Sequence, residues 1–583
     1  MDDIVLLGDE ALALGCLHAG LSCGFGYPGT PSTEIMEYLI DSYEKGTFYG
    51  APKSFDSTEF VAQWCSNEKT AYESALGASF AGKRAIVTMK HVGLNVAADP
   101  FMNSAMLKIN GGLIVAVADD PSMHSSQGEQ DSRFMADFAQ IPCFEPVSQQ
   151  EAYEMAFEAF EISEKYHVPV MMRLVTRLSH SRSRVHLLEP NKYVSKNSLN
   201  KGNKLDWMLL PALARKRYDI LLKKQADLLS WSEKGKRNIL NMTSRKDLAI
   251  ITSGLGYNYY TENLADYKIF CKKEGKELPS TLHIGTLPFP KKLIQKLADQ
   301  CETILVIEEG QPLIEKRLLG LLTSKTKIIG KYSGHLNLSG ELNPDVVRKA
   351  LGLNSHKTAC ANLNTVNGFN AADFCKDLPG RPPQLCKGCP HGDSYTSLNL
   401  ACERLIKKAG ANNVVVNADI GCYSLGAVPP YNAIESVVCM GASIGMARGA
   451  AQAGVKYAFG VIGDSTFLHS GITNLVDCVS TKTPITVVIL DNSIVAMTGC
   501  QPTMLPSSQL EPFIRGIGIE PEHVRVLATN PNKHEENAAI LEAEAEYRGP
   551  SVVIMVRECL EAFRLRTKKE KIAKAQAEKN EIK

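Results

Sequence analysis

Short apolar runs alternate with amphipathic stretches along most of the chain. In the first third, residues 85–89 (AIVTM), 113–118 (LIVAVA) and 168–174 (VPVMMRL) are apolar at nearly every position, and 68–81 (EKTAYESALGASFA) reads as a helix. Continuous apolar runs are typical of parallel strands that are buried on both faces. The alternation therefore predicts an α/β fold, with a doubly wound parallel sheet over residues 1–180.

The same pattern returns twice further along the chain. The stretches DLAIITSGLGY (247–257) and ETILVIEEG (302–310) predict strands of a second α/β domain at 246–355. A third α/β domain at 381–560 is predicted to contain strands at 413–417, 457–462, 485–490 and 551–556. The remaining segments are a linker with a basic amphipathic helix at 181–245, a linker at 356–380 and a charged tail at 561–583.

Composition narrows the class of protein. A chain of 583 residues is too long for one core, and its 44% hydrophobic and 22% charged residues are ordinary for a globular protein. The net charge of +1 predicts no nucleic acid partner. The apolar runs are shorter than a membrane span, and the start MDDIVLLGDE lacks signal-peptide features, so we expect a cytoplasmic protein without membrane contact. Sixteen cysteines in such a chain favour metal or redox chemistry.

Two polar loops follow predicted strands in the third domain. Asp464 stands in GDSTFLHSG after one strand, and Asn492 stands in ILDNS after the next, 28 positions later. Mg²⁺ prefers hard oxygen ligands, which the Asp464 carboxylate, the Asn492 side-chain carbonyl and the Ile494 backbone carbonyl can supply. Gly463 allows close backbone approach, and a following helix N-terminus favours an anion. The dipeptide GD of the first loop or DN of the second, taken alone, is typical of a turn. Together, at this spacing after two strands, they favour Mg²⁺-bound thiamine diphosphate (TPP).

Several longer motifs stand out along the chain. They are GYPGTPSTEI (26–35), NEKTAYESALGAS (67–79), TMKHVGLNVAADP (88–100), DDPSMHSSQGEQDSR (119–133), WMLLPALARKR (207–217), CKGCPHGDS (386–394), GDSTFLHSGI (463–472) and VVILDNSIVAMTG (487–499). In this order they resemble the α-subunit of indolepyruvate:ferredoxin oxidoreductase, within the 2-oxoacid:ferredoxin oxidoreductase superfamily. The resemblance implies TPP-binding folds with a transketolase C-terminal-like middle domain, and oxidative decarboxylation of an aryl 2-oxoacid of the indolepyruvate or phenylpyruvate type. The acyl group would pass to coenzyme A and the electrons to ferredoxin, using TPP, Mg²⁺ and one [4Fe–4S] cluster.

The resemblance also assigns roles to residues of the first domain. TPP needs a carboxylate beside its aminopyrimidine ring to form the tautomer that removes its C2 proton. Relatives place this glutamate nine residues before a Gly-Ala pair, which selects Glu68 over Glu59 and Glu73. Thr30 matches a threonine that contacts the substrate carboxylate, although a loop hydroxyl that caps the following helix is the alternative. Four further residues lie in matching segments: His91, Asn95, His124 and His469. Each either lines the substrate pocket or has a structural role.

The cysteine pattern carries the cluster prediction. Cys386 and Cys389 form a CxxC motif, which can bind zinc, form a redox pair or ligate iron–sulfur, but no second CxxC follows at zinc spacing. The resemblance adds Cys422, after Gly421, and Cys559, after the strand that begins at Gly-Pro-Ser 549–551. Four unrelated buried cysteines are the alternative. The same resemblance assigns cofactor binding to Gly421, Cys422, Gly463 and Ser465.

The chain departs from this family at its end. Relatives carry a ferredoxin-like extension with two further cluster motifs, whereas no cysteine follows Cys559 here. We therefore expect further clusters on another chain, or direct docking of ferredoxin. Expected partners are a small γ-type subunit, ferredoxin or a ferredoxin-like subunit, and a second copy in a dimer of heterodimers, whose interface joins the pyrimidine and diphosphate ends of TPP. The alternatives are a non-oxidative TPP-dependent decarboxylase and an inactive scaffold or regulatory subunit.

Overall fold

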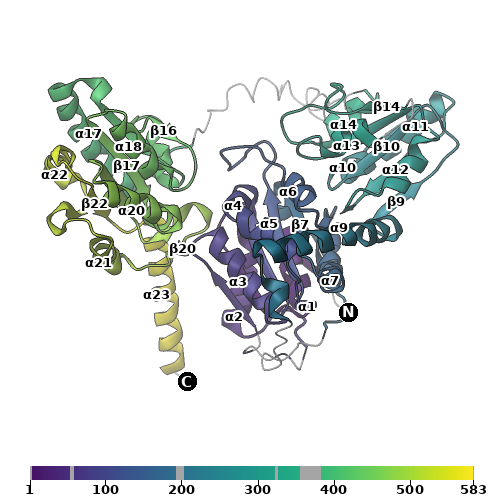
Figure 1. The fold of residues 1–583 in the computed structure, drawn as a ribbon, viewed down its shortest axis with the longest axis horizontal. Coiled ribbons are helices and arrows are strands. Elements are labelled where there is room, and N and C mark those ends of the chain that lie inside the picture. The colour runs from purple at the N-terminus through teal and green to yellow at the C-terminus, as the bar shows by residue number, and fades with distance from the viewer. Residues whose placement is uncertain are drawn as a thin grey trace. The chain divides into compact units, whose positions relative to one another are not determined.

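The structure is a computed structural model that describes residues 3–52, 55, 58, 60–191, 203–321, 326–354 and 383–581. It divides into two compact units, Met1–Leu378 and Pro379–Lys583, which run from purple to teal and from green to yellow in Figure 1. The linker predicted at 356–380 and the candidate Glu59 lie outside the described residues. None of the described helices is both long and apolar enough to cross a membrane.

The first sheet of unit 1 has seven strands in the order β12-β6-β7-β5-β4-β2-β3. Neighbouring strands are parallel, except that β12 is antiparallel to β6. This confirms the strands predicted at 85–89, 113–118 and 168–174. The bounds are β2 (Cys23–Gly26), β3 (Val61–Trp64), β4 (Ala85–Lys90), β5 (Leu113–Asp119), β6 (Cys143–Phe144), β7 (Val170–Val175) and β12 (Thr286–Leu287).

Helices cover both faces of this sheet. Val115 and Val117 of β5 pack into one core together with residues of α3 (Glu68–Phe80) and α5 (Ala98–Met106). Ile114 and Ala116 point the other way, into a second core with helices from the opposite layer. The helices of that layer are α1 (Gly8–His18), α2 (Thr33–Lys45) and α7 (Gln149–Tyr166). Burial on both faces explains the continuous apolar runs and confirms a doubly wound sheet.

The second sheet of unit 1 has five strands in the order β14-β13-β10-β11-β9. It is parallel apart from β9, which pairs antiparallel with β11. Its strands are β9 (Asn238–Asn241), β10 (Ala249–Ser253), β11 (Ser280–Ile284), β13 (Thr303–Ile307) and β14 (Lys327–Ile329). The helices around it are α10 (Gly256–Glu262), α11 (Leu264–Lys273), α12 (Lys291–Ala298), α13 (Leu313–Leu321) and α14 (Pro344–Ala350).

The segment predicted as a linker at 181–245 contributes regular structure. Strand β8 (Arg182–His186) pairs antiparallel with β1 (Asp3–Leu7), and β9 closes an edge of the second sheet. The predicted basic helix is α9 (Pro211–Lys234), which contacts both α5 and α12. These strands have few buried side chains, so no apolar run marks them in the sequence.

Unit 2 is built on one six-stranded parallel sheet in the order β16-β15-β17-β18-β22-β21. Phe459 and Val461 of β17 enter one core, and Ala458 and Ile462 enter another on the opposite face. The strands are β15 (Val414–Ala418), β16 (Ser436–Val437), β17 (Tyr457–Gly463), β18 (Thr486–Asp491), β21 (Val524–Ala528) and β22 (Ser551–Val556). The four strands predicted for this domain are confirmed.

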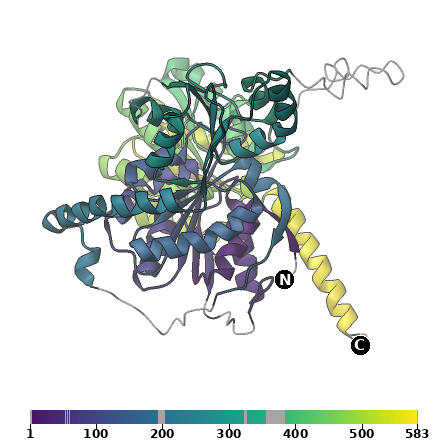
Figure 2. The same cartoon turned by 90° about the vertical axis from the view of Figure 1, so that its right-hand side faces the viewer.

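Helices α17 (Pro390–Ala409), α18 (Ala442–Gln452), α20 (Ile472–Thr481), α21 (Ser507–Ile517) and α22 (His534–Glu546) surround this sheet. The charged tail forms α23 (Leu560–Glu581), the long yellow helix that projects from unit 2 in Figures 1 and 2. The side chains described along it are mostly exposed, which agrees with their charge.

Candidate functional site

Two loops meet at the carboxyl ends of β17 and β18. Asp464 directly follows β17 and is buried, and its Oδ1 accepts a hydrogen bond from the Ser465 backbone N–H at 2.8 Å. Its Oδ2 accepts from the backbone N–H of Ser493 at 2.8 Å, in the loop after β18. This bond joins the loop of Asp464 to the loop of Asn492, as the sequence predicts. The carboxyl ends of parallel strands are where such sheets bind ligands.

Asp491, which directly precedes Asn492 and was not predicted as a site residue, adds a second carboxylate. Burial raises the pKa of Asp464 well above its ordinary value, and the adjacent Asp491 charge raises this pKa further. Asp491 Oδ1 accepts hydrogen bonds from Ser493 N (3.0 Å) and Ser507 Oγ (2.7 Å). Its Oδ2 is buried without a hydrogen-bond partner among the described residues. Two facing buried carboxylates need a proton or a cation between them, so this donor set fits Mg²⁺.

His391 orients the amide of Asn492. Asn492 Nδ2 lies 3.3 Å from His391 Nε2. Burial lowers the pKa of His391 to about 4, so the ring is neutral near pH 7 and can accept the amide N–H. The amide oxygen then faces away and accepts from Ile494 N at 3.2 Å, which leaves a lone pair for a cation. His391 was not singled out from the sequence, although it lies in the quoted CKGCPHGDS segment.

The glycines at these strand ends accommodate a tyrosine ring. A Cβ at Gly421 would lie 2.3 Å from a ring carbon of Tyr423, and a Cβ at Gly463 would lie 2.6 Å from the same atom. The Tyr423 hydroxyl donates to Asp419, and burial raises the pKa of Asp419 to about 6. A side chain at either glycine would therefore collide with the Tyr423 ring.

His469 lies in a π-helical turn, Phe467–Gly471, that follows Asp464 in the same loop. The ring is buried, and its Nδ1 is 2.5 Å from Ser470 Oγ. Single π-helical turns inside helices are frequent at functional sites. His469 therefore stays a candidate, beside the same strand end as Asp464.

The CxxC cysteines form a turn that leads into α17. The Cys389 backbone N–H donates to Cys386 O at 2.9 Å. A Cβ at Gly388, between them, would contact Leu560 at 3.7 Å, so this turn lies beside the start of α23. The backbone N–H of Cys559 in turn donates to Asn492 O at 3.4 Å. The turn and Cys559 therefore lie close to the loop that follows β18.

Cys422 lies within electrostatic range of the other three predicted cluster thiols. Burial raises the pKa of Cys422 to about 12, and the neighbouring thiols of Cys389, Cys559 and Cys386 add to this rise. Cys500 contributes more weakly and makes a fifth nearby thiol. In the ranges described, no three His, Cys, Asp or Glu side chains converge to hold a single metal ion. A [4Fe–4S] cluster takes four thiolates on four separate irons, so this donor set suits it chemically.

In unit 1, Glu68 is the first residue of α3. The Asn67 side chain caps this helix by accepting from Thr70 N at 2.8 Å, which fixes where the helix begins. Glu68 is 5% exposed. Gly93, in α4 (His91–Val96), packs against it, because a Cβ there would lie 2.5 Å from Glu68 Oε1. The competitor Glu73 is exposed and paired with Lys69.

We expect Gly93→Ala to disturb this carboxylate. The added methyl group has no room beside Glu68, so the free energy of unfolding should fall by about 1–3 kcal/mol. Urea unfolding of the isolated chain measures this change. Gly77→Ala is the matched control, because nothing lies within 4 Å of a Cβ at Gly77 in α3. That control should be neutral or slightly stabilising, and an equal loss in both variants would contradict the packing argument.

Thr30 lies in the loop after β2. Its backbone carbonyl accepts from Ser125 Oγ at 3.3 Å, which ties this loop to the segment after β5. The residue that precedes α2 is Ser32, whose hydroxyl donates to Gly29 O at 2.8 Å. Both loops leave carboxyl ends of strands in the first sheet, where Glu68 of α3 also lies against Gly93.

The other pocket candidates of unit 1 divide into two groups. His91 Nε2 lies 2.9 Å from Gly128 O, and Asn95 Nδ2 donates to Gln130 Oε1 at 2.7 Å, so both contact the 128–130 segment. His124 is half exposed and faces Glu341, with an ion-pair distance of 3.5 Å. The structure therefore brings His91 and Asn95 together and places His124 against another element.

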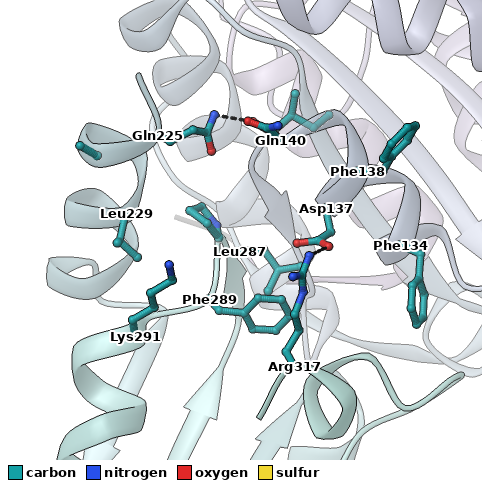
Figure 3. A pocket seen from close by; sticks show the side chains of 13 residues that line it. Phe134, Asp137, Phe138, Gln140, Gln225, Leu229, Leu287, Phe289, Lys291 and Arg317 are labelled. Carbon is teal, nitrogen blue, oxygen red and sulfur yellow. Dashed lines mark hydrogen bonds and ion pairs between the residues drawn. The ribbon is translucent and has the colours of Figure 1, made fainter. Parts of the chain in front are cut away.

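A cavity of about 700 Å³ in unit 1 lies away from these residues. Figure 3 shows its polar side chains pairing with one another: Gln225 donates to Gln140 O at 3.0 Å, and Arg317 pairs with Asp137. None of the predicted site residues lines this cavity. The lining residues are Phe134, Asp137, Phe138, Gln140, Ile141, Gln225, Ala226, Leu229, Leu287, Pro288, Phe289, Lys291 and Arg317.

Two family profiles match the chain. Residues 14–216 match "Pyruvate flavodoxin/ferredoxin oxidoreductase, thiamine diP-bdg", and residues 419–555 match "Thiamine pyrophosphate enzyme, C-terminal TPP binding domain". The fold and the site thus define a protein with two kinds of TPP-binding domain.

Full-length relatives specify the family. The "Indolepyruvate oxidoreductase subunit IorA" of Archaeoglobus fulgidus is 35% identical over 96% of this chain and 86% of its own length. The subunits of that name from Methanothermobacter thermautotrophicus (34% identity, 96% and 87%) and Pyrococcus horikoshii (33%, 96% and 86%) are similar. The chain belongs to the indolepyruvate oxidoreductase subunit IorA family, which confirms the resemblance.

One solved structure is also similar. It is the 2-oxoglutarate:ferredoxin oxidoreductase from Magnetococcus marinus with 2-oxoglutarate, coenzyme A and succinyl-CoA bound. The TM-score is 0.47 and the sequence identity is 16%. The match covers 60% of this chain and 65% of that chain.

Proposed function

We propose that this chain is the large catalytic subunit that oxidatively decarboxylates an aryl 2-oxoacid, of the indolepyruvate or phenylpyruvate type, to its acyl-CoA and CO₂. Electrons pass to ferredoxin. The observation that carries the proposal is the buried oxygen set at the ends of β17 and β18, Asp464, Asp491 and Asn492, in a chain of the IorA family. The names of the relatives support the substrate class.

In this proposal, Asp464, Asn492 and the carbonyl of Ile494 hold the Mg²⁺ that binds the diphosphate of TPP. Bound TPP supplies the electron sink that allows a bond next to a carbonyl to break. Glu68 holds a proton at the ring nitrogen of the aminopyrimidine, and Gly93 makes room for its carboxylate. Thr30 and His469 contact the substrate, while Gly421, Gly463 and Ser465 lie against the cofactor. The buried position of Glu68 and Asp464 supports these roles.

Electrons leave through thiolate ligands in the same unit. Cys386, Cys389, Cys422 and Cys559 supply the four ligands of one [4Fe–4S] cluster, and coenzyme A accepts the acyl group. The partners are a small γ-type subunit, and ferredoxin or a ferredoxin-like subunit that receives the electrons. The relatives' name, a "subunit", supports a complex. We propose a dimer of heterodimers, whose interface joins the pyrimidine and diphosphate ends of TPP.

Anaerobic isolation of the complex tests this proposal. The chain should contain about four irons, and Cys422→Ala should lose them while TPP still binds, because Asp464 and Asn492 are on other loops. Phenylpyruvate-dependent reduction of a viologen dye should then stop. The measurements are iron analysis, TPP titration and dye reduction. Cys478→Ala is the matched control, because Cys478 is buried in an apolar core of the same unit. This variant should keep its iron.

Each alternative predicts a different result. Absence of iron with phenylpyruvate-dependent CO₂ release would favour the non-oxidative decarboxylase. Failure to bind TPP would favour the scaffold. Eight or twelve irons in this chain, counted apart from its partner subunits, would mean that further cysteines of the chain are ligands.

A further inference from the structure

Lys90 is an ionisable residue at the predicted substrate end of unit 1 that has no role in the site so far. It is the last residue of β4, and its methylene groups pack on Gly29, where a Cβ would lie 3.2 Å from Lys90 Cγ and Cδ. Its Nζ donates to Ser125 O at 3.2 Å. Ser125 Oγ also donates to Thr30 O at 3.3 Å. The ammonium therefore lies where the loop of Thr30 meets the 120–126 segment.

Two carboxylates lie near this ammonium without pairing with it. Burial lowers the pKa of Lys90 to about 8, and the charges of Asp120 and Glu68 oppose that fall. In the described part of the chain, Lys90 donates one hydrogen bond and forms no ion pair. Two of its three N–H donors are thus uncommitted.

Asp120 is already committed to other donors. Its Oδ2 accepts from Ser125 N (2.8 Å) and Ser126 Oγ (2.7 Å), and its Oδ1 accepts from Thr176 Oγ1 (2.8 Å). Although burial opposes them, these hydrogen bonds hold the pKa of Asp120 below its ordinary value. The Asp120 carboxylate therefore stabilises the conformation of the 120–126 loop, and the Lys90 ammonium can bind another anion.

Unpartnered polar atoms flank Lys90 on the chain. Thr88 Oγ1 and His91 Nδ1 are both buried without a hydrogen-bond partner among the described residues. Thr88 precedes Lys90 by two residues on β4, so both side chains point to the same face of the sheet. Gly26 lies against Thr88 as Gly29 lies against Lys90. This face thus carries a cation with two uncommitted N–H donors and, among the described residues, a buried hydroxyl without a hydrogen-bond partner.

We propose that the Lys90 ammonium binds the carboxylate of the 2-oxoacid, beside Thr30 and within electrostatic range of Glu68. This inference rests on the proposed function and deepens it. A 2-oxoacid brings one carboxylate into a largely buried site, where it needs a cation and N–H donors. Lys90 supplies both, and its position near Glu68 places the carboxylate close to the group that acts on the pyrimidine ring.

Ligand binding to the TPP-loaded complex tests this role. Two ligands are compared: phenylpyruvate, and phenylacetone, which has a methyl group in place of the carboxylate. Lys90→Met should weaken phenylpyruvate binding about 30- to 100-fold, the value of a charge-assisted hydrogen bond. Phenylacetone affinity and TPP affinity should change less than about twofold, because neither involves the ammonium. Lys90→Arg should restore most of the phenylpyruvate affinity.

Lys45→Met is the control, because Lys45 is an exposed residue of the same domain that pairs with Asp41. It should change neither affinity. Lys90→Gln provides a second neutral variant that keeps a polar end if Lys90→Met does not fold. Equal losses for both ligands, or an unchanged phenylpyruvate affinity with TPP bound, would overturn the role of Lys90 alone. If the unaltered complex binds TPP but no phenylpyruvate, the substrate assignment and the role of Lys90 both fall.

Discussion

Asp464→Ala should abolish Mg²⁺-dependent TPP binding, with a loss of affinity of at least about a hundredfold. The variant removes a carboxylate from the proposed Mg²⁺ set and also the acceptor that holds the Ser493 loop. Asp491 would then be the only carboxylate left beside the proposed cation, which would lose both a ligand and half of the local negative charge. Calorimetric titration of the apoprotein with TPP, at fixed Mg²⁺, measures the effect.

Asp477→Ala is the matched control for this variant. Asp477 lies in α20 of the same unit, is exposed and pairs with Arg448, so its loss should leave TPP affinity unchanged within about twofold. Asp464→Asn separates charge from shape, because it keeps the size of the side chain. Tight Mg²⁺-dependent TPP binding by Asp464→Ala would place the diphosphate elsewhere.

Glu68→Gln should leave TPP bound but slow exchange of its C2 proton by about 10²- to 10⁴-fold. Glutamine is nearly isosteric, so it fits against Gly93 as Glu68 does. It cannot hold a proton between a carboxylate and the ring nitrogen, and this removes the assistance on which exchange depends. Rapid-quench deuterium exchange, followed by NMR of the released TPP, gives the rate constant.

Glu73→Gln provides the comparison on the same helix. Glu73 is five positions further along α3 and is exposed beside Lys69, so exchange should stay at the unaltered rate. If both variants exchange normally, Glu68 is not the pyrimidine carboxylate. If Glu68→Gln fails to bind TPP, its role is structural.

The parts of the fold that apolar runs mark were predictable. Strands such as β4 and β5 are buried on both faces, so nearly every residue in them is apolar. Strands β8 and β9 were not predicted, because they lie at edges and bury few side chains. Their pairing with β1 and β11 is set by contacts far apart in the sequence.

The site was predictable where a polar side chain that can bind a metal directly follows a predicted strand. Asp464 and Asn492 were found in this way. Asp491 stands in the same DN pair, but only its interaction with Asp464 in the folded chain reveals a second carboxylate at the site. His391 and Gly93 act by touching other site residues. Such roles depend on three-dimensional contact, which a single sequence does not encode locally. Gly93 could have been suspected from its place in the quoted KHVGLN segment.

The backbone hydrogen bond from Cys559 to Asn492 has a consequence for the speed of electron flow. In the proposed assignment it joins the loop that holds the metal to a residue that holds the cluster, by main-chain atoms alone. If both groups bind as proposed, the separation of their two sites would be set by the main chain at the end of β18 and the start of α23. Under that assignment, side-chain substitutions on the surface would change which partner collects the electrons without changing the separation of the two sites.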